Sequence, residues 1–597
     1  MDKPQSTRRR KARRRVMVLL VLCCAVFALF LARLAWLQFA MADHYAQKMA
    51  EASSSSYTLP QHAARGAITD RSGTVLAQDE TVYDVYLRVP APPGTNLRET
   101  VNTIAALTGG KDVETQLAAF CSAVSAGELP VTQGLDSIGA AAYYHAGLVQ
   151  NGAVRLAARG VRRWPDGTIL PHTLGFTGPI TAEQWPAARA QGLAMDATIG
   201  QNGLEAAYDT LLRGRDGQLQ INVGLDGVTR ETVQTSTPVP GCTLVLTLDA
   251  DLQKTLQTAL QNQMDTLRTT KGIGAGREVR AGAAVVVDVR TGGILAAASL
   301  PDFDLSRYRS DYAALSADSA APLLDRVCQG LYAPGSAFKP AVAAAALTAG
   351  IDPAATVNCT GKYFYYSNYH PGCLQYGHRG PVDLRTALEY SCNIFFYDTG
   401  RRLGVDTFSA MARQLGLAND TGVEITAAQG RLTWSTDTNY QDGLTLMAAI
   451  GQGNTAVTPL QLAQYAAALA NYGRKPTLHF ADRAVQPATG AAVWQYEPAF
   501  TEIPGGEAVF GPIRDGMKRM AQTARALREA PVTVAAKTGS PQLADTLPGG
   551  SHYVNSVLIG YAPADDPQIA MAVVLEYGGG GANAAPVMRA VLDAWFE

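Results

Sequence analysis

The sequence predicts a multidomain α+β protein with an N-terminal transmembrane helix, an extended α+β pedestal domain and a C-terminal α/β sandwich. Three observations predict this fold class. Residues 16–40 are almost free of charge, residues 60–240 contain short strand-like runs separated by Gly and Pro, and residues 241–597 place strands before and after a group of Ala-rich helices. The length of 597 residues also exceeds that of one ordinary domain.

The N-terminus combines a basic block with an apolar run. Residues 1–15 have a net charge of +7, so the rest of the chain sums to −8 within a total of −1. At about 1.5 Å per residue, residues 16–40 can cross a bilayer core of about 30 Å, and the basic block keeps residues 1–15 in the cytoplasm. We therefore predict a single-pass protein of the cell membrane with an extracytoplasmic catalytic domain. A signal peptide cleaved after Ala42 is the alternative, which the long apolar run disfavours.

Between the anchor and residue 241, the sequence predicts a linker and then the pedestal domain. The linker covers residues 41–59, and its Ser-rich part, residues 51–57, is typical of a flexible stalk. The pedestal domain covers residues 60–240 and ends at a Pro- and Gly-rich segment. The mildly acidic charge of the chain after residue 15 argues against nucleic acid as a partner.

The pattern of residues 241–597 predicts a single β-sheet with helices packed on it. Asp249 is the expected N-cap of a long helix. The expected strands are residues 244–249, 283–289, 294–299, 533–537, 554–561 and 569–575, and the expected helices are residues 249–267, 340–348, 458–471 and 585–596. A hairpin followed much later by three strands indicates a five-stranded antiparallel sheet flanked by helices.

The first motif with chemical meaning is S-x-x-K, at Ser336 and Lys339. Ser336 follows Gly335 at the start of an Ala-rich helix, so its Oγ and N–H face the same side. Lys339, three residues later, lies on the same helix face, where a desolvated amine can remove the serine proton. Alone, the motif also fits a capping serine beside a surface lysine.

Two later motifs complete the set. Ser391 and Asn393 form S-x-N, in which the hydroxyl can relay a proton and the amide can bind a peptide group. Residues 537–540 form K-T-G-S after an apolar strand. Lys537, Thr538 and Ser540 can bind a carboxylate, and Gly539 lets a substrate backbone approach the strand.

The order and spacing of these motifs resemble those of class B, monofunctional penicillin-binding proteins. The resemblance extends to residues 65–77, 163–167, 172–175, 203–214, 247–253, 450–453 and 458–461. It implies a serine-type peptidoglycan D,D-transpeptidase, with carboxypeptidase activity as a side reaction and β-lactams as inhibitors. The implied roles are nucleophile for Ser336, base for Lys339, a second catalytic pair for Ser391 and Asn393, and carboxylate binding by the K-T-G-S motif. The N–H groups of Ser336 and Ser540 would form the oxyanion hole.

The resemblance also implies partners: peptidoglycan stem peptides on lipid-linked glycan strands, and a polytopic glycosyltransferase of the SEDS type. Two other functions share the motifs. A membrane-anchored β-lactamase or β-lactam sensor is one, although we find no deacylating glutamate in an E-x-x-x-N pattern after Ser391. A non-catalytic scaffold is the other, although no motif is eroded. Elongation, division and sporulation are equally open as the cellular role.

The loop before Ser391 contains Cys359, His370, Cys373 and His378. Free thiols, a Cys359–Cys373 disulfide and a metal site are the three alternatives. The ligand types fit zinc, but their spacing is not diagnostic. We therefore assign no metal and no cofactor from the sequence.

Overall fold

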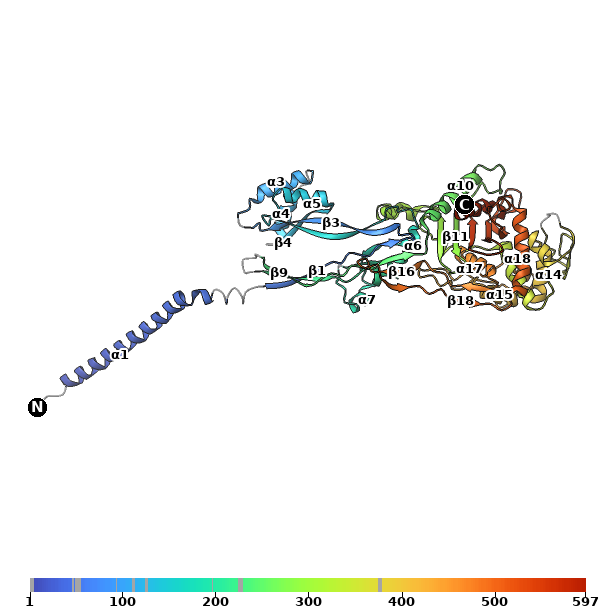
Figure 1. The fold of residues 1–597 in the computed structure, drawn as a ribbon. Coiled ribbons are helices and arrows are strands. Elements are labelled where there is room, and N and C mark those ends of the chain that lie inside the picture. Colours follow the sequence, from blue (N-terminus) through green and yellow to red (C-terminus); the bar gives the residue numbers. More distant parts are fainter. Residues whose placement is uncertain are drawn as a thin grey trace. The chain divides into compact units, whose positions relative to one another are not determined.

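The computed structural model describes residues 5–45, 48, 55–92, 94–109, 113–123, 127–195, 197–223, 229–373 and 378–597 (Figure 1). The chain forms two compact units. The first contains residues 1–63 and 215–239, and the second contains residues 64–214 and 240–597. We describe each unit by itself.

The first unit contains the N-terminal helix and a small sheet. Helix α1 (Gln5–Ala35) continues into the π-helical turn η1 (Trp36–Ala40). Residues 10–40 are long and apolar enough to cross a membrane. The Arg33 guanidinium lies 4.4 Å from the centre of the Trp36 ring, where a cation and an aromatic ring attract each other. This single helix agrees with the predicted anchor.

The sheet of the first unit corrects part of the predicted stalk. Strand β1 (Ser55–Gln61) pairs antiparallel with β8 (Gly217–Val223), and β8 pairs with β9 (Thr229–Ser236). Residues 51–54 lie outside the described residues, but residues 55–57 are strand rather than flexible linker. Pairing with a segment more than 150 residues away decides their conformation, and a local composition does not reveal such a partner.

The second unit begins with the elements of the predicted pedestal. They are β2 (Ile68–Thr69), β3 (Val75–Val89), α3 (Leu97–Leu107), α4 (Val113–Ala123), β4 (Gly127–Leu135), α5 (Ser137–His145), β5 (Val154–Arg163), α6 (Pro171–Leu174), β6 (Thr177–Pro179), α7 (Trp185–Ala190), β7 (Thr198–Gly200), α8 (Gly203–Ala207) and α9 (Asp209–Leu212). The expected strand over residues 81–88 lies within β3, and the expected helix over residues 97–107 is α3.

Buried ion pairs link the pedestal motifs. Arg65 Nε donates to Glu205 Oε2 at 2.6 Å, and Arg162 Nε donates to Glu205 Oε1 at 2.6 Å. Arg65 Nη1 also donates to Asp209 Oδ1 at 2.7 Å. Glu205 is 0% exposed, so loss of either arginine would leave a buried charge short of a partner. These motif residues therefore hold the unit together.

A continuous sheet crosses the predicted domain boundary at residue 240. Its strand order is β17-β16-β10-β2-β3-β4, with β5 also paired to β3. Strand β10 (Thr243–Leu246) pairs in parallel with β2, through Leu244 opposite Ile68. The other strands that this sheet takes from beyond residue 240 are β16 (Ala481–Val485) and β17 (Ala492–Gln495). The residues before and after the predicted boundary thus share backbone hydrogen bonds.

The C-terminal part has the predicted order of strands, helices and strands. Its other elements are α10 (Ala250–Arg268), β11 (Gly282–Asp288), β12 (Ile294–Leu300), η2 (Leu305–Arg307), α11 (Tyr308–Ala317), η3 (Gly335–Phe338), α12 (Lys339–Thr348), β13 (Val357–Cys359), β14 (Gly380–Val382), α13 (Leu384–Glu389), α14 (Asn393–Leu403), α15 (Val405–Gln414), α16 (Asp442–Ala449), α17 (Pro459–Ala470), β15 (Arg474–Pro476), β18 (Phe500–Glu502), α18 (Gly506–Thr523), α19 (Arg525–Arg528), β19 (Ala535–Gly539), β20 (Gln542–Thr546), β21 (His552–Val554), β22 (Ser556–Ala562), β23 (Ile569–Leu575), η4 (Gly581–Ala584) and α20 (Ala585–Phe596). Asp249 caps α10 as expected, accepting from the N–H groups of residues 251 and 252.

The central sheet has the order β12-β11-β23-β22-β19, and every pair in it is antiparallel. Helices α10 and α20 pack on one face, and α12, α14 and α17 contribute to the core on the other. All residues of β22 and β23 are buried, as expected for strands covered on both faces. The five-stranded antiparallel sandwich is therefore as predicted, and β19 forms one of its edges.

Candidate active site

Ser336 lies in the turn η3, which leads directly into the buried helix α12. Gly335 has φ = +55°, a left-handed value that favours glycine. Its N–H donates to the Gly451 carbonyl at 2.9 Å, and a Cβ on Gly451 would lie 2.2 Å from the Gly335 carbonyl oxygen. Close packing of these two glycines therefore positions Ser336 at the start of the helix, partly exposed, as the sequence predicted.

Lys339 is 0% exposed and donates three hydrogen bonds to the second motif. Its Nζ lies 2.7 Å from Asn393 Oδ1, 2.8 Å from the Ser391 carbonyl oxygen and 3.1 Å from Ser391 Oγ. Burial lowers the pKa of Lys339 to about 7, opposed in part by two nearby cysteines. A large share of this amine is therefore neutral near pH 7. Within the described residues, no hydrogen bond joins Lys339 to Ser336, although the sequence indicated that the amine can reach that hydroxyl.

Ser391 bridges two lysines. Its Oγ lies 3.1 Å from Lys339 Nζ and 3.1 Å from Lys537 Nζ. Its φ is +57°, a strained value for a non-glycine residue and one that clusters at active sites. Asn393, two residues later, begins helix α14. The arrangement lets one hydroxyl pass a proton between the two amines.

Lys537 lies in the edge strand β19 and is also 0% exposed. Besides Ser391, its Nζ donates to the Thr538 carbonyl oxygen at 3.0 Å. Burial, and secondarily the charge of Lys339, hold the pKa of Lys537 well below its usual value. The two amines therefore oppose each other's protonation.

Gly539 and Ser540 bring the third motif against the first. A Cβ on Gly539 would lie 2.2 Å from the Pro334 carbonyl oxygen, so this glycine is required by the serine turn itself. The Ser540 N atom lies 3.2 Å from the point where a Cβ on Gly335 would sit. Ser540 Oγ accepts a hydrogen bond from the Gly581 N–H at 2.8 Å. The end of the third motif therefore lies directly against the turn that carries Ser336.

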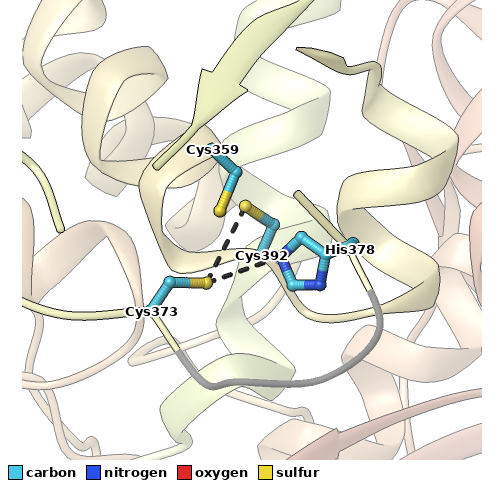
Figure 2. Close-up of side chains that lie close together, drawn as sticks. All are labelled: Cys359, Cys373, His378 and Cys392. Carbon is cyan, nitrogen blue, oxygen red and sulfur yellow. Dashed lines mark hydrogen bonds between the residues drawn. The ribbon is translucent and has the colours of Figure 1, made fainter. Parts of the chain in front are cut away.

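A second cluster of chemically reactive side chains adjoins the S-x-N motif. Sγ of Cys359, Cys373 and Cys392 and a ring nitrogen of His378 all lie within 4.8 Å of one another, and all four residues are buried (Figure 2). Each of these cysteines is free in the structure. His370, which the sequence grouped with them, is exposed instead. Sequence reasoning missed Cys392, because it stands inside S-x-N rather than in the loop.

Hydrogen bonds link this cluster to the catalytic motif. The Asn393 N–H donates to Cys373 Sγ at 3.3 Å, and a hydrogen bond of 3.9 Å joins the sulfurs of Cys373 and Cys392. His378 Nε2 lies 3.5 Å from Cys373 Sγ. These hydrogen bonds, that with the Cys392 thiol above all, hold the pKa of Cys373 well below its usual value. The four side chains are the described residues best suited to hold a metal ion.

Two family models of penicillin-binding proteins match this chain. A family model for the penicillin-binding protein transpeptidase domain matches residues 282–593, and one for the penicillin-binding protein dimerisation domain matches residues 60–246. The chain belongs to the class B penicillin-binding proteins. The matches agree with the resemblance found in the sequence, and the predicted site residues from Ser336 to Ser540 lie within the transpeptidase match.

Curated relatives and solved structures cover nearly the whole chain. The peptidoglycan D,D-transpeptidase MrdA of Acinetobacter baumannii is 29% identical, over 90% of this chain and 81% of the relative. MrdA of Escherichia coli K12 is 26% identical, over 90% of this chain and 87% of the relative. A structure described as a peptidoglycan synthase complex that coordinates polymerization and crosslinking matches with a TM-score of 0.73 and 28% identity, over 98% of both chains. Penicillin-binding protein 2 of Helicobacter pylori, solved with MreC, shares the fold at 22% identity and a TM-score of 0.73, over 91% of this chain and 99% of that one.

Proposed function

We propose that this penicillin-binding protein is a peptidoglycan D,D-transpeptidase that cross-links stem peptides through an ester on Ser336. The observation that carries this proposal is the convergence of the motifs on one hydroxyl, with Lys339 and Lys537 each 3.1 Å from Ser391 Oγ. A buried, partly neutral lysine one turn from a serine is the arrangement that activates a weak nucleophile.

Acylation begins when Ser336 Oγ attacks the carbonyl carbon of the penultimate D-alanine. The serine proton passes to the neutral amine of Lys339, and the N–H groups of Ser336 and Ser540 stabilise the oxyanion. The C–N bond then breaks, and the terminal D-alanine leaves as an amine that receives a proton through Ser391. The amine of a second stem peptide reverses these steps and forms the cross-link. Water in place of that amine gives the carboxypeptidase side reaction.

The terminal carboxylate of the donor peptide binds to Lys537, Thr538 and Ser540. The Gly581 N–H already occupies one lone pair of Ser540 Oγ, which leaves the hydroxyl proton free for the carboxylate. A carboxylate beside Lys537 favours the protonated amine, and that charge disfavours protonation of Lys339. Substrate binding therefore keeps the general base neutral when it is needed.

The N-terminal helix anchors the enzyme in the cell membrane, with residues 1–15 in the cytoplasm and the catalytic domain outside it. This orientation follows from the basic block before the helix. The peptidoglycan synthase complex among the similar structures supports a partner that polymerises lipid-linked glycan strands, for which we propose a SEDS-type glycosyltransferase. We also propose the domain limits given by the sequence, with the pedestal over residues 60–240 and the transpeptidase domain over residues 241–597.

The lifetime of a penicillin adduct separates this function from that of a β-lactamase. A β-lactamase needs a group that activates water against the acyl ester, and losing an effective general base costs about 10²–10⁴-fold in rate. We expect near-stoichiometric acylation of the full-length protein in detergent, with adducts that persist for many minutes in intact-protein mass spectrometry. Multiple turnovers per minute, together with nitrocefin hydrolysis, would favour the β-lactamase instead. No acylation at all would favour a scaffold.

A further inference from the structure

Exposed aromatic side chains gather in the loop between β13 and β14. Residues 363–370, called the aromatic loop below, include five Phe or Tyr residues among eight. The loop is closed at its base, where the Tyr363 N–H donates to the Pro371 carbonyl at 3.0 Å. Phe364 and Tyr365 are 64% and 58% exposed. Large apolar side chains that share one exposed place indicate a binding surface rather than part of the core.

The structure holds these rings in place. The hydroxyl of the buried Tyr363 donates to Asp398 Oδ1 at 3.0 Å and accepts from Arg401 Nε at 3.0 Å. Burial raises the pKa of Tyr363 to about 12, so this hydroxyl keeps its proton at neutral pH. The Arg401 guanidinium lies 3.9 Å from the centre of the Tyr365 ring. Side chains that are fixed before a ligand arrives lose little conformational entropy when they bind it.

The aromatic loop adjoins the active site through two contacts. The Gly372 carbonyl, at the end of the loop, accepts from Asn393 Nδ2 at 3.3 Å. The Tyr366 hydroxyl donates to the carbonyl of Asp442, the first residue of α16, at 3.4 Å. The far end of α16 leads to Gly451, which packs against the serine turn. A ligand on the aromatic loop would therefore lie beside both the S-x-N motif and the helix that supports the nucleophile.

The chemistry of the aromatic loop fits sugar rings. Residues 363–372 contain no Asp, Glu, Lys or Arg, and the nearby Arg401 and Arg402 both pair with Asp398. A charged stem peptide or an anionic membrane surface needs charged partners, which this loop does not offer. A pyranose ring has an apolar C–H face and a rim of hydroxyl and acetamido groups. Tyrosine matches both, with an apolar ring and a polar tip.

We propose that the aromatic loop binds the sugar rings of a peptidoglycan glycan strand and so brings the stem peptides of that strand to Ser336. The delivery of stem peptides rests on the proposed transpeptidase function, whereas the binding of sugar does not. Binding forms and breaks no covalent bond. The enzyme should therefore prefer a stem peptide on a glycan strand to the same peptide free in solution, because the second contact adds to the first.

Sugar binding is measured on full-length protein in a detergent without a sugar headgroup. The probe is a glycan strand freed of its stem peptides by an amidase, and the method is isothermal titration calorimetry. Phe364→Ala, Phe364→Leu and Tyr365→Ala should each weaken binding about 3–10-fold, since each removes a ring face. Phe364→Trp should bind as the unchanged protein does.

The matched control is Tyr312→Ala, which removes a tyrosine of α11 that is 51% exposed. It should leave the affinity unchanged. Binding should also persist at about 0.5 M salt, which screens the lactyl carboxylates that the amidase uncovers. A bare glycan strand without affinity, or full affinity in Phe364→Leu, would overturn the proposal. A free stem peptide that loses as much affinity in these variants would assign the loop to peptide instead and overturn it as well.

Delivery of the stem peptide is measured by cross-linking of linear peptidoglycan strands in the purified system. The double variant Phe364→Ala, Tyr365→Ala should need about 10–100-fold more strand for the half-maximal rate. Its acylation by fluorescent penicillin should be unchanged, because the loop does not touch the reacting bond, and circular dichroism should show the same fold. Strand cross-linking that is unaffected, or acylation that falls equally, would contradict delivery by the loop. Unchanged protein that binds glycan but never acylates would overturn the proposed function and leave the sugar site standing.

Discussion

Replacing Ser336 by alanine should abolish covalent labelling by fluorescent penicillin. In the proposed mechanism the ester forms on Ser336 Oγ, whereas the neighbouring Ser391 hydroxyl, within hydrogen-bond distance of Lys339 and Lys537, relays a proton. The fold should be unaffected, because the Ser336 side chain makes no hydrogen bond within the described residues. Gel fluorescence and intact-protein mass spectrometry measure the loss, which should be complete.

The control for this change is Ser310→Ala, which alters an exposed serine in helix α11. It should label at the rate of the unchanged protein, and both variants should have the same melting temperature within about 1–2 °C. Stoichiometric labelling of Ser336→Ala would show that another residue is the nucleophile.

Replacing Lys339 by methionine should slow acylation by about 10²–10⁴-fold, the usual contribution of a general base. Methionine has a similar length and keeps the buried volume filled. In the unchanged protein, the acylation rate should rise about tenfold per pH unit and level off above about pH 7, because only the neutral amine accepts the serine proton. The variant should lack this dependence. Stopped-flow acylation between pH 5 and 9 measures both effects.

Lys362→Met, a change of an exposed lysine, is the control and should keep both the rate and the pH profile. The variant Lys339→Met leaves Asn393 Oδ1 and the Ser391 carbonyl without a donor, so its stability is checked separately by thermal unfolding. An unchanged acylation rate in a folded Lys339→Met would remove this lysine from the mechanism.

Much of the architecture was predictable because it follows from local sequence patterns. The fully buried strands β22 and β23 have the continuous apolar runs that predict them, and Asp249 has the N-cap signal of α10. The stalk was mispredicted at residues 55–57, since β1 depends on a strand far away in the sequence.

The catalytic motifs were predictable as well, but their detailed contacts were not. Lys339 contacts Ser391 and Asn393 rather than Ser336, and the packing of three separate segments decides which acceptors its amine meets. The sequence assigned Gly539 to the approach of a substrate, and it did not reveal that a Cβ at this position would also collide with the Pro334 carbonyl oxygen. The place of Cys392 in the cysteine cluster was not predictable, because the folded chain brings the S-x-N motif against the loop that carries Cys359 and Cys373. Such contacts depend on tertiary packing, which one sequence does not encode in a readable pattern.

The central claim is that acyl-Ser336 is transferred to an amine. The most direct measurement supplies the full-length protein with a thioester mimic of the donor stem peptide and a labelled D-amino acid as the acceptor. Liquid chromatography with mass spectrometry then identifies the products. We predict a product that contains the acceptor, formed by the unchanged protein and absent with Ser336→Ala. A product formed only by hydrolysis, or an acceptor product that survives Ser336→Ala, would contradict the account.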